Sequence, residues 1–217
     1  MSDKLNNLLD EKLANGREYR NTKSIEIRAE GEAEDYIVEG YASTFNEPYV
    51  LYDWGDYIVR EQIDPHAFDD CDMSDVIMQY NHEGRVFARS SNGTLEVSTD
   101  DHGLKIRADL SGTEAGRQLY EEIKGGYTTK MSFGFVVAED TREVVEDYEN
   151  NKTEVLRTIT KFSKLYDVSA VSLPANDATE ISARSYSDGV IEELEAERLE
   201  AEKRKRQKQR IRILMEV

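Results

Sequence analysis

The sequence is poor in residues and segments on which several common kinds of protein depend. It has one cysteine, Cys71, three prolines and three histidines in 217 residues. A single cysteine excludes an internal disulfide and fits a reducing, intracellular setting. No apolar run approaches the length of a membrane span, and the first residues lack a signal-peptide pattern. We therefore expect a protein that has no contact with a membrane.

Motifs for metal, nucleotide and α/β-hydrolase sites are also missing. There is no HExxH, no cysteine pair, and no two histidines at the spacing of metal ligands. The P-loop and GxGxxG signatures are absent, and so is the GxSxG nucleophile elbow. The sequence therefore predicts neither a metal site nor a cofactor.

Negative charge, in contrast, is in excess. The 45 acidic and 28 basic residues give a net charge of -17 at pH 7. This charge argues against general nucleic-acid binding, because phosphate recognition needs clustered cations. The basic residues gather near the end, where residues 203–212 hold seven of the 28. We expect an acidic body with a basic tail that docks on an acidic partner surface.

Hydrophobic periodicity predicts a mainly β protein with one clear helix. Alternation indicates strands at 23–31, 35–46, 127–137 and 154–176, and a hairpin at 93–110. Capping residues and a Gly-Gly pair predict a helix over 111–126. Residues 47–68 are expected to be a loop and the acidic residues 138–153 a mobile excursion. The expected fold class is α+β, with an antiparallel β-barrel core, peripheral helices and helical arms at both termini.

The chain is expected to have three parts. Residues 1–23 form a polar N-terminal arm, residues 24–186 the central domain, and residues 187–217 a charged tail. Apolar positions are sparse from Asp188 onward, so the tail is expected to be a solvated helix or a coil outside the core.

Among the three histidines, His82 has the most informative position. His102 lies in a predicted turn and His66 follows a proline, so both are expected to be ordinary surface residues. His82 ends a short apolar strand, where the scaffold can hold its ring toward a cleft. Imidazole titrates near neutral pH and can take a proton from a serine. From its position alone, a purely structural role for His82 stays open.

Ser132 stands out because it lies inside a predicted strand. In residues 127–137, aromatic and apolar side chains alternate with Ser132, so the serine faces the opposite side of the strand. Gly134, next on the same face, leaves bare backbone beside it. This pattern fits either a solvent-facing serine or a nucleophile that a substrate must approach.

Six short motifs, taken in order, resemble those of the prohead proteases of tailed phages, which are distantly similar to the herpesvirus assemblins. The resemblance spans about residues 24–183, and the shared order makes the short motifs specific together. Where many members have glycine before AF, this chain has His66, which argues against a catalytic role for that histidine. The motifs are VEGYASTFN (38–46), EQIDPHAF (61–68), MQYNHE (78–83), DDHGLKIRADL (100–110), MSFGF (131–135) and YDVSAVSLPANDATEI (166–181).

The resemblance implies a serine endopeptidase that matures capsids. The histidine of the family's NH motif matches His82, and the serine of its SxGF motif matches Ser132. Ser132 would form an acyl-enzyme with His82 as general base, and Gly134 would leave space for an extended substrate strand. Oxyanion donors are usually backbone N–H groups, and we expect them near Ala175 and Asn176.

The resemblance also implies where and on what the enzyme acts. Its substrate would be the major capsid protein or a scaffold protein, inside the assembling prohead in the host cytoplasm. The charged tail is a candidate for self-cleavage, and the sequence is compatible with an oligomer. Two other hypotheses stay open. The chain could be a non-catalytic capsid-assembly or scaffold-interaction protein, or an esterase that uses the same serine and histidine.

A third residue is expected to orient the imidazole. Assemblins use a second histidine after the serine strand, but no histidine follows Ser132 in this chain. Phage members of the family tend to carry an acid before VS, and Asp167 holds that place in a largely apolar strand. An acid inside a core strand is costly unless it is paired. Asp167 is therefore the predicted partner of His82, with Glu83 and Ser169 as the alternatives.

Overall fold

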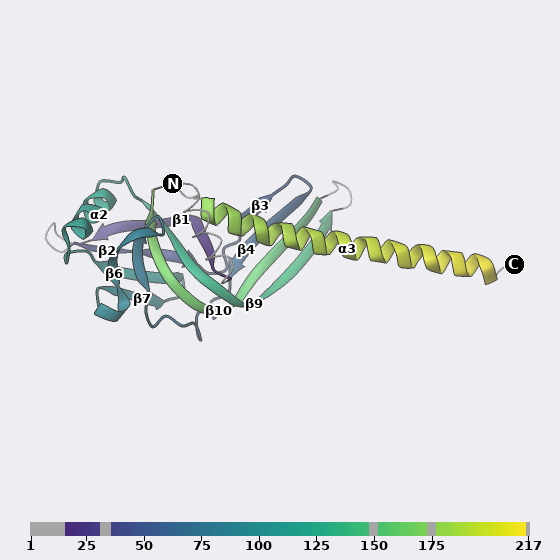
Figure 1. Cartoon of the computed structure of the whole chain (residues 1–217), viewed down its shortest axis with the longest axis horizontal. Coiled ribbons are helices and arrows are strands. Elements are labelled where there is room, and N and C mark those ends of the chain that lie inside the picture. The colour runs from purple at the N-terminus through teal and green to yellow at the C-terminus, as the bar shows by residue number, and fades with distance from the viewer. Residues whose placement is uncertain (1–15, 31–35, 148–151, 173–176, 216–217) are drawn as a thin grey trace.

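The computed structural model describes residues 16–30, 36–147, 152–172 and 177–215 (Figure 1). Residues 1–15 of the predicted N-terminal arm lie outside this part of the chain. In chain order, the elements are β1 (Glu18–Glu30), β2 (Ile37–Thr44), β3 (Tyr49–Asp53), β4 (Tyr57–Ile63), β5 (Ile77–Tyr80), β6 (Glu83–Arg89), the 3-10 turn η1 (Ser90–Asn92), β7 (Leu95–Thr99), β8 (Gly103–Asp109), α2 (Glu114–Lys124), β9 (Lys130–Asp147), β10 (Lys152–Val171) and α3 (Asp177–Met215).

The strands form one open sheet. Their order is β3-β4-β10-β9-β1-β2-β8-β7, with β5 beside β10 and β6 beside β5. One edge of β10 is shared, because β4 pairs with its first half and β5 with its second half, both in parallel. The β3–β4 hairpin therefore extends away from β7 and does not close on it (Figure 1). The α+β class is confirmed, but the expected closed barrel is wrong.

The long ribbon of β9 and β10 crosses the whole sheet. Their antiparallel pairing runs from Lys130 opposite Val171 to Asp147 opposite Lys152. The expectation of a mobile excursion is wrong for residues 138–147, which continue β9. Backbone pairing with β10 and ion pairs hold this acidic stretch in the sheet, so it needs no apolar face.

Residues 47–68 contain two strands in place of the expected loop. β3 and β4 pair as a hairpin, and β4 runs parallel to β10 from Tyr57 to Ile63. Val59, Glu61 and Ile63 are all buried on one face of β4. Strand alternation thus carries a carboxylate into the interior between two β-branched residues.

The core lies on the aromatic face of β9. The ring centroids of Phe133 and Phe135 are 4.6 Å apart, and Phe162 of β10 packs 4.9 Å from Phe135. This packing fixes β9 from one side and leaves its other side to Ser132.

The predicted helix is confirmed as α2, which begins after Thr113, whose hydroxyl accepts the Gly116 N–H. The predicted hairpin at 93–110 is confirmed as β7 and β8.

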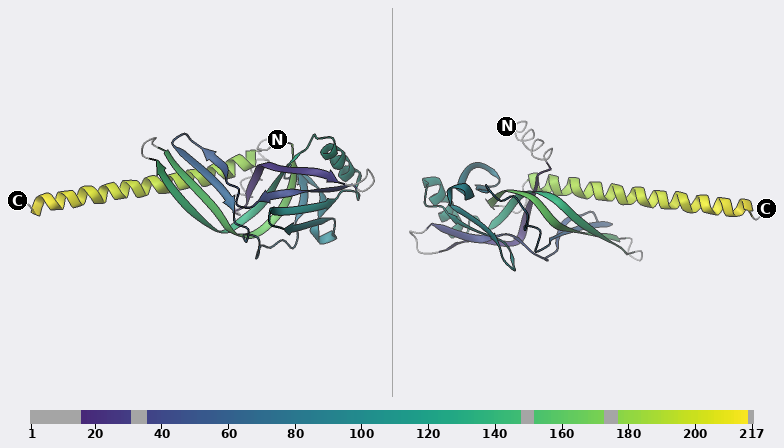
Figure 2. Two further views of the ribbon diagram at one scale, coloured as in Figure 1. Left: turned by 180° about the vertical axis from the view of Figure 1, so that it is seen from behind. Right: turned by 90° about the horizontal axis from the view of Figure 1, so that it is seen from below.

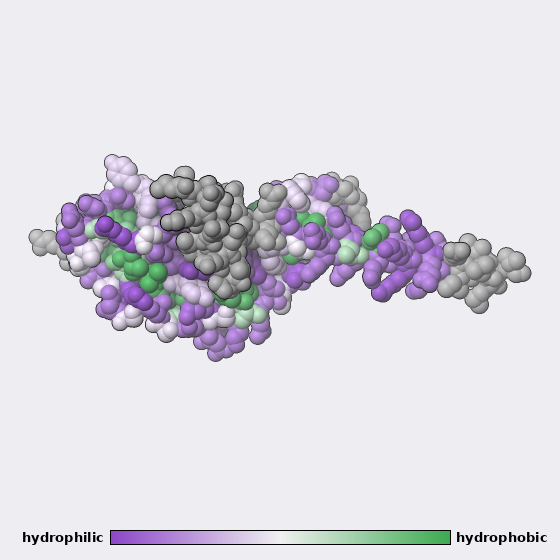
Figure 3. All heavy atoms as spheres, in the orientation of Figure 1, coloured by the Kyte–Doolittle hydropathy of each residue, from purple (hydrophilic) through white to green (hydrophobic). Residues whose placement is uncertain are grey.

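The helix α3 first packs on the sheet and then projects from it. Val190 and Ile191 are buried, and Val190 packs against Val59 of β4 and Val155 of β10. The expectation that the chain leaves the core from Asp188 onward is therefore wrong by about one helical turn. Beyond this contact α3 continues past the strands, as Figure 2 shows from two further sides, and its projecting surface is largely hydrophilic (Figure 3). Within the described residues, no helix combines the length and the apolar character needed to cross a membrane.

Shortening α3 at two points is expected to separate its packed part from its projecting part. A chain that ends at Ser187 loses Val190 and Ile191, so we expect its free energy of unfolding to fall by about 3 kcal/mol. A chain that ends at Glu202 keeps both residues and should stay within about 0.5 kcal/mol of the full chain. Urea unfolding measures both, and equal stabilities of the two truncated chains would contradict the packing described here.

Candidate active site

A tight hairpin turn carries His82. Tyr80 of β5 pairs with Glu83 of β6, so Asn81 and His82 are the two central residues of the turn. Their φ angles are 51° and 61°. Two-residue turns of this kind need positive φ at both positions, which asparagine adopts readily and histidine less often. The Asn81 N–H donates to the Ala170 carbonyl at 3.0 Å and fixes the turn to the end of β10.

The turn, β9 and β10 bring three of the predicted site residues into one hydrogen-bonded chain. His82 Nε2 lies 2.5 Å from Ser132 Oγ, and His82 Nδ1 lies 2.5 Å from Asp167 Oδ1. The exposed fractions are 3% for His82 and 0% for both Ser132 and Asp167. A hydroxyl, an imidazole and a carboxylate in this order are the parts of a nucleophilic triad.

A cation and a hydroxyl support the carboxylate of Asp167. The guanidinium of Arg17 pairs with Oδ2, and the Ser169 hydroxyl donates to Oδ1 at 2.9 Å. Burial alone raises the pKa of this carboxyl, but His82, Arg17 and Ser169 outweigh it and lower the pKa below its usual value. Ser169, one of the two alternatives to Asp167 as partner of His82, thus donates its hydrogen bond to Asp167. Glu83 is exposed at the start of β6.

The space beside Gly134 is filled, which differs from the expected open path for a substrate. A Cβ at this position would collide with the carboxylate of Asp167. It would also lie 2.9 Å from Tyr19 Cε1 and 3.1 Å from Arg17 Nη2. Glycine is therefore required here because the side chains of Asp167, Tyr19 and Arg17 occupy the place of a side chain.

The first residues of β1 cover the serine. Residues 18–21 pair with β9 antiparallel, with Asn21 opposite Ser132 and Arg20 opposite Phe133. Ser132 Oγ lies 2.8 Å from the carbonyl oxygen of Arg20. The ring of Tyr19 packs edge-on to His82, with centroids 4.6 Å apart. This cover differs from the expectation that residues 1–23 form a polar arm and that Ser132 is accessible.

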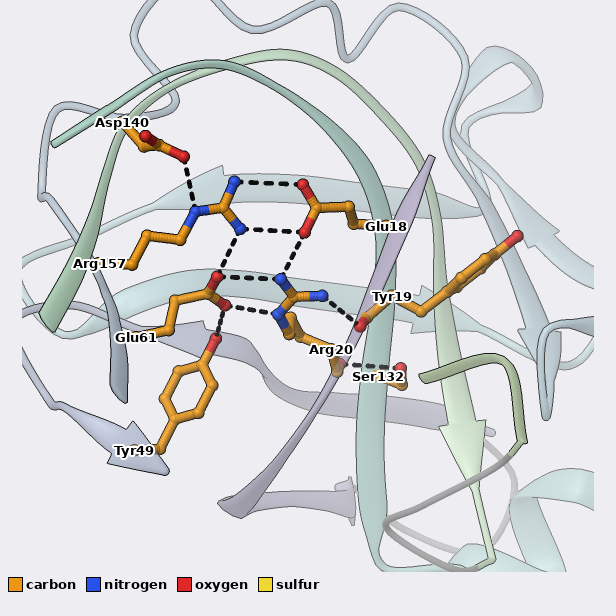
Figure 4. Close-up of polar contacts among 8 residues, drawn as sticks. All are labelled: Glu18, Tyr19, Arg20, Tyr49, Glu61, Ser132, Asp140 and Arg157. Atoms are coloured by element: carbon orange, nitrogen blue, oxygen red, sulfur yellow. Dashed lines mark hydrogen bonds and ion pairs between the residues drawn. The ribbon is translucent and has the colours of Figure 1, made fainter. Parts of the chain in front are cut away.

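The side chain of Arg20 enters a buried ionic cluster next to the serine (Figure 4). Its Nε and Nη2 donate to the two oxygens of Glu61 at 2.5 and 2.9 Å. The hydroxyl of Tyr49 donates to Glu61 Oε1 at 2.5 Å, and Arg157 Nη1 donates to Oε2 at 2.8 Å. Arg157 also pairs with Asp140 at 2.7 Å, and both guanidinium groups contact Glu18.

The cluster keeps Glu61 ionised although its side chain is fully buried. Burial raises the pKa of Glu61, but the charges of Arg20 and Arg157 and the hydrogen bonds to Arg20 and Tyr49 outweigh it and hold the pKa at about 2. The sequence did carry a signal for this residue. Glu61 stands two positions from Val59 and from Ile63, so strand alternation places it on their apolar face.

The remaining candidate residues lie away from the hydrogen-bonded chain of Ser132, His82 and Asp167, or they fall outside the described residues. His66 is exposed and its Nδ1 lies 3.1 Å from Asp69, while His102 packs edge-on to Tyr41 in the β7–β8 turn. The predicted oxyanion residues, Ala175 and Asn176, fall in the segment 173–176 that the structure does not describe. In the part of the chain that is described, no group of three histidine, cysteine or acidic residues is arranged to hold a metal ion.

Comparison with known proteins identifies the family to which the chain is similar. The model of the Caudovirus prohead serine protease family matches residues 23–191, which include His82, Ser132 and Asp167. The chain is also 30% identical over 169 residues to the prohead protease of Enterobacteria phage HK97, an alignment that covers 76% of this chain and 67% of that protein. No solved structure matches it. The chain therefore belongs to the family of caudovirus prohead serine proteases.

Proposed function

We propose that the chain is a serine endopeptidase that cleaves the major capsid protein or a scaffold protein inside the assembling prohead, in the host cytoplasm. One observation carries the proposal: Ser132, His82 and Asp167 form a buried, hydrogen-bonded chain. The family supports protease chemistry in capsid maturation, and its name supports the serine type.

In the proposed mechanism Ser132 is the nucleophile and His82 the general base. With a proton on Nδ1 donated to Asp167, His82 keeps Nε2 free to accept the Ser132 proton. Oγ then attacks the scissile carbonyl, and the imidazolium returns the proton to the leaving amine as an acyl-enzyme forms. Water, deprotonated by the same imidazole, hydrolyses the acyl-enzyme.

Asp167 gives this mechanism its electrostatic support. A carboxylate with a lowered pKa stays negative at neutral pH, so it both fixes the tautomer of His82 and stabilises the imidazolium. Because Asp167 is fully buried, this attraction acts with little screening by water.

The test is to mix purified protein with its companion capsid precursor and to sequence the new chain ends, with a Ser132→Ala variant in parallel. Cleavage at defined peptide bonds that depends on Ser132 supports the proposal. An inactive capsid-assembly protein would bind the precursor without cutting it, and an esterase would hydrolyse ester substrates but leave the precursor intact.

A methyl group at Gly134 is expected to disturb the triad without removing any of its members. Gly134→Ala forces Asp167 away from its position, and a misplacement of about 1 Å lowers kcat/KM by about 10²-fold. Gly112→Ala is the matched control, because a Cβ at Gly112 has open space around it. Peptide-cleavage rates and melting temperatures should be measured for both variants. Wild-type activity in Gly134→Ala would contradict the close packing described here.

A further inference from the structure

We propose that residues 17–21 occupy the substrate cleft of their own protease domain, and that the Arg20–Asn21 peptide bond is a self-cleavage site. The side chain of Arg20 then marks a specificity pocket closed by Glu61, which selects arginine or lysine immediately before the scissile bond in other substrates. The inference rests on the proposed role of Ser132 as nucleophile.

The position of the Arg20 carbonyl is the first argument. Its oxygen lies 2.8 Å from Ser132 Oγ. Because a C=O bond is about 1.23 Å long, the carbonyl carbon lies within about 4.0 Å of the same Oγ. The Ser132 hydroxyl donates to this oxygen, so the carbonyl must turn its oxygen away from Oγ before the carbon comes within the distance of a reacting carbonyl, about 3–3.5 Å.

The backbone of residues 18–21 also runs as a substrate strand would. It pairs antiparallel with β9, the strand that carries Ser132, and so extends the sheet by strand addition. The regular pairing ends at Asn21, opposite Ser132, and the next pair is Glu26 with Lys130. Five residues of β1 thus correspond to only two residues of β9. The chain thus leaves the ladder directly on the amine side of the Arg20–Asn21 bond, where a leaving group needs room.

The pocket for Arg20 is built for a cation. Glu61 receives the guanidinium through two oxygens, in the bidentate geometry that distinguishes charged pairs of high specificity (Figure 4). Both side chains are almost completely buried, at 1% exposed for Arg20 and 0% for Glu61. Tyr49 and Arg157 hold the carboxylate from β3 and β10, so the scaffold fixes it independently of β1.

The partners that Glu61 keeps without the strand agree with this assignment. When residues 17–20 leave, Glu61 still accepts from Tyr49 and Arg157 but loses the bidentate guanidinium of Arg20. A fully buried carboxylate that has lost such a partner favours a new cation, whereas an apolar side chain would leave its oxygens incompletely paired. The pocket is therefore suited to arginine or lysine from another chain.

The burial of Ser132 requires that the strand leave. A protease of this family acts on other proteins, but Ser132 has no exposed surface while β1 lies across it. Cleavage of Arg20–Asn21 opens the cleft, because it detaches Arg17, Tyr19 and Arg20 from the domain and frees their contacts to Asp167, His82 and Glu61.

The self-cleavage step uses the groups already in place. Ser132 Oγ bonds to the Arg20 carbonyl carbon while its proton passes to His82 Nε2. The C–N bond then breaks, and His82 gives the proton to the nitrogen of Asn21, which becomes a new amino terminus. Water attacks the Arg20 ester with His82 as base, which releases the Arg20 carboxylate and restores the Ser132 hydroxyl.

The direct test follows the amino terminus of the full chain. Incubated wild-type protein should accumulate a species that begins at Asn21, detected by intact mass and terminal sequencing, while Ser132→Ala keeps residues 1–20. Arg20→Lys should preserve this cut and Arg20→Leu should abolish it. Melting temperatures check that both variants fold, because Arg20→Leu leaves Glu61 with fewer partners.

A second measurement uses only the wild-type enzyme after processing. The peptides should differ only in the residue before the scissile bond. Those with arginine or lysine there should have a kcat/KM at least about 10²-fold higher than those with leucine or glutamate. A site built to pair with a polar group rejects side chains that cannot make the pair. Glu61→Gln should lose most of this preference.

The outcomes separate this inference from the proposed function. If the precursor is cut in a Ser132-dependent way while residues 1–20 stay attached, or while leucine peptides react as fast as arginine peptides, the inference is wrong and the function stands. If wild-type protein cuts neither the precursor nor itself, both are wrong.

Discussion

Ser132→Ala is expected to abolish cleavage of the capsid precursor while the protein still folds. The substitution removes the hydroxyl that contacts His82 Nε2 and leaves the aromatic packing of β9 intact. Loss of a triad nucleophile costs about 10⁶-fold in kcat, which places the remaining rate near the limit of detection. The precursor should therefore stay at full length over times that exceed complete processing by wild-type enzyme.

The control for this experiment is the same substitution at an exposed serine. Ser98 lies on the solvent side of β7, so Ser98→Ala should process the precursor at the wild-type rate. Circular dichroism and melting temperature should show that Ser132→Ala has the native fold. Wild-type cleavage by a folded Ser132→Ala protein would reject Ser132 as the nucleophile.

The backbone at His82 determines how the base should be tested. Its φ of 61° is left-handed, a conformation that asparagine tolerates better than alanine. We therefore expect His82→Asn to keep the hairpin turn and to lose activity about as fully as Ser132→Ala. Because the two groups act as a unit, the double variant should lose little beyond either single one.

Local signals in the sequence predicted the elements that depend on local chemistry. The Thr113 cap and the Gly-Gly stop define α2, and alternation around a turn defines β7 and β8. The extension of β9 and the β3–β4 hairpin were missed because their stability comes from pairing with β10, a partner distant in the sequence. An acidic strand with polar side chains on both faces has no apolar pattern to reveal it.

Strand patterns singled out some residues of the candidate site, and the resemblance to the prohead proteases assigned their roles. Ser132 interrupts an aromatic strand, and Asp167 stands in an apolar one. The cover by residues 18–21 was not predictable, because nothing local in a polar segment shows that it will pair with β9 above the serine. The pairing of Arg20 with Glu61 likewise joins residues 41 positions apart, and only the folded sheet brings them together.

Asp167→Asn is expected to lower turnover by about 10⁴-fold with the fold preserved, the size of loss when a triad acid is made neutral. The amide can present an N–H to His82 Nδ1, which then becomes an acceptor and places the imidazole proton on Nε2. Nε2 can no longer accept the Ser132 proton, and the imidazolium loses the buried charge that stabilises it. The loss should appear mainly in kcat, because the carboxylate acts on His82 and not on bound substrate.

The informative comparison is with the acid next to His82 in the sequence. Glu83 is exposed, so Glu83→Gln should retain activity within a few fold of wild type, whereas Asp167→Asn should not. Asp167 also pairs with Arg17 and accepts from Ser169, so melting temperatures must show that the asparagine variant is folded. A folded Asp167→Asn enzyme of near-normal kcat, or an equal loss in Glu83→Gln, would move the third role away from Asp167. Either result would leave the pairing of Ser132 with His82 as the reacting unit, since that contact does not depend on which acid supports the ring.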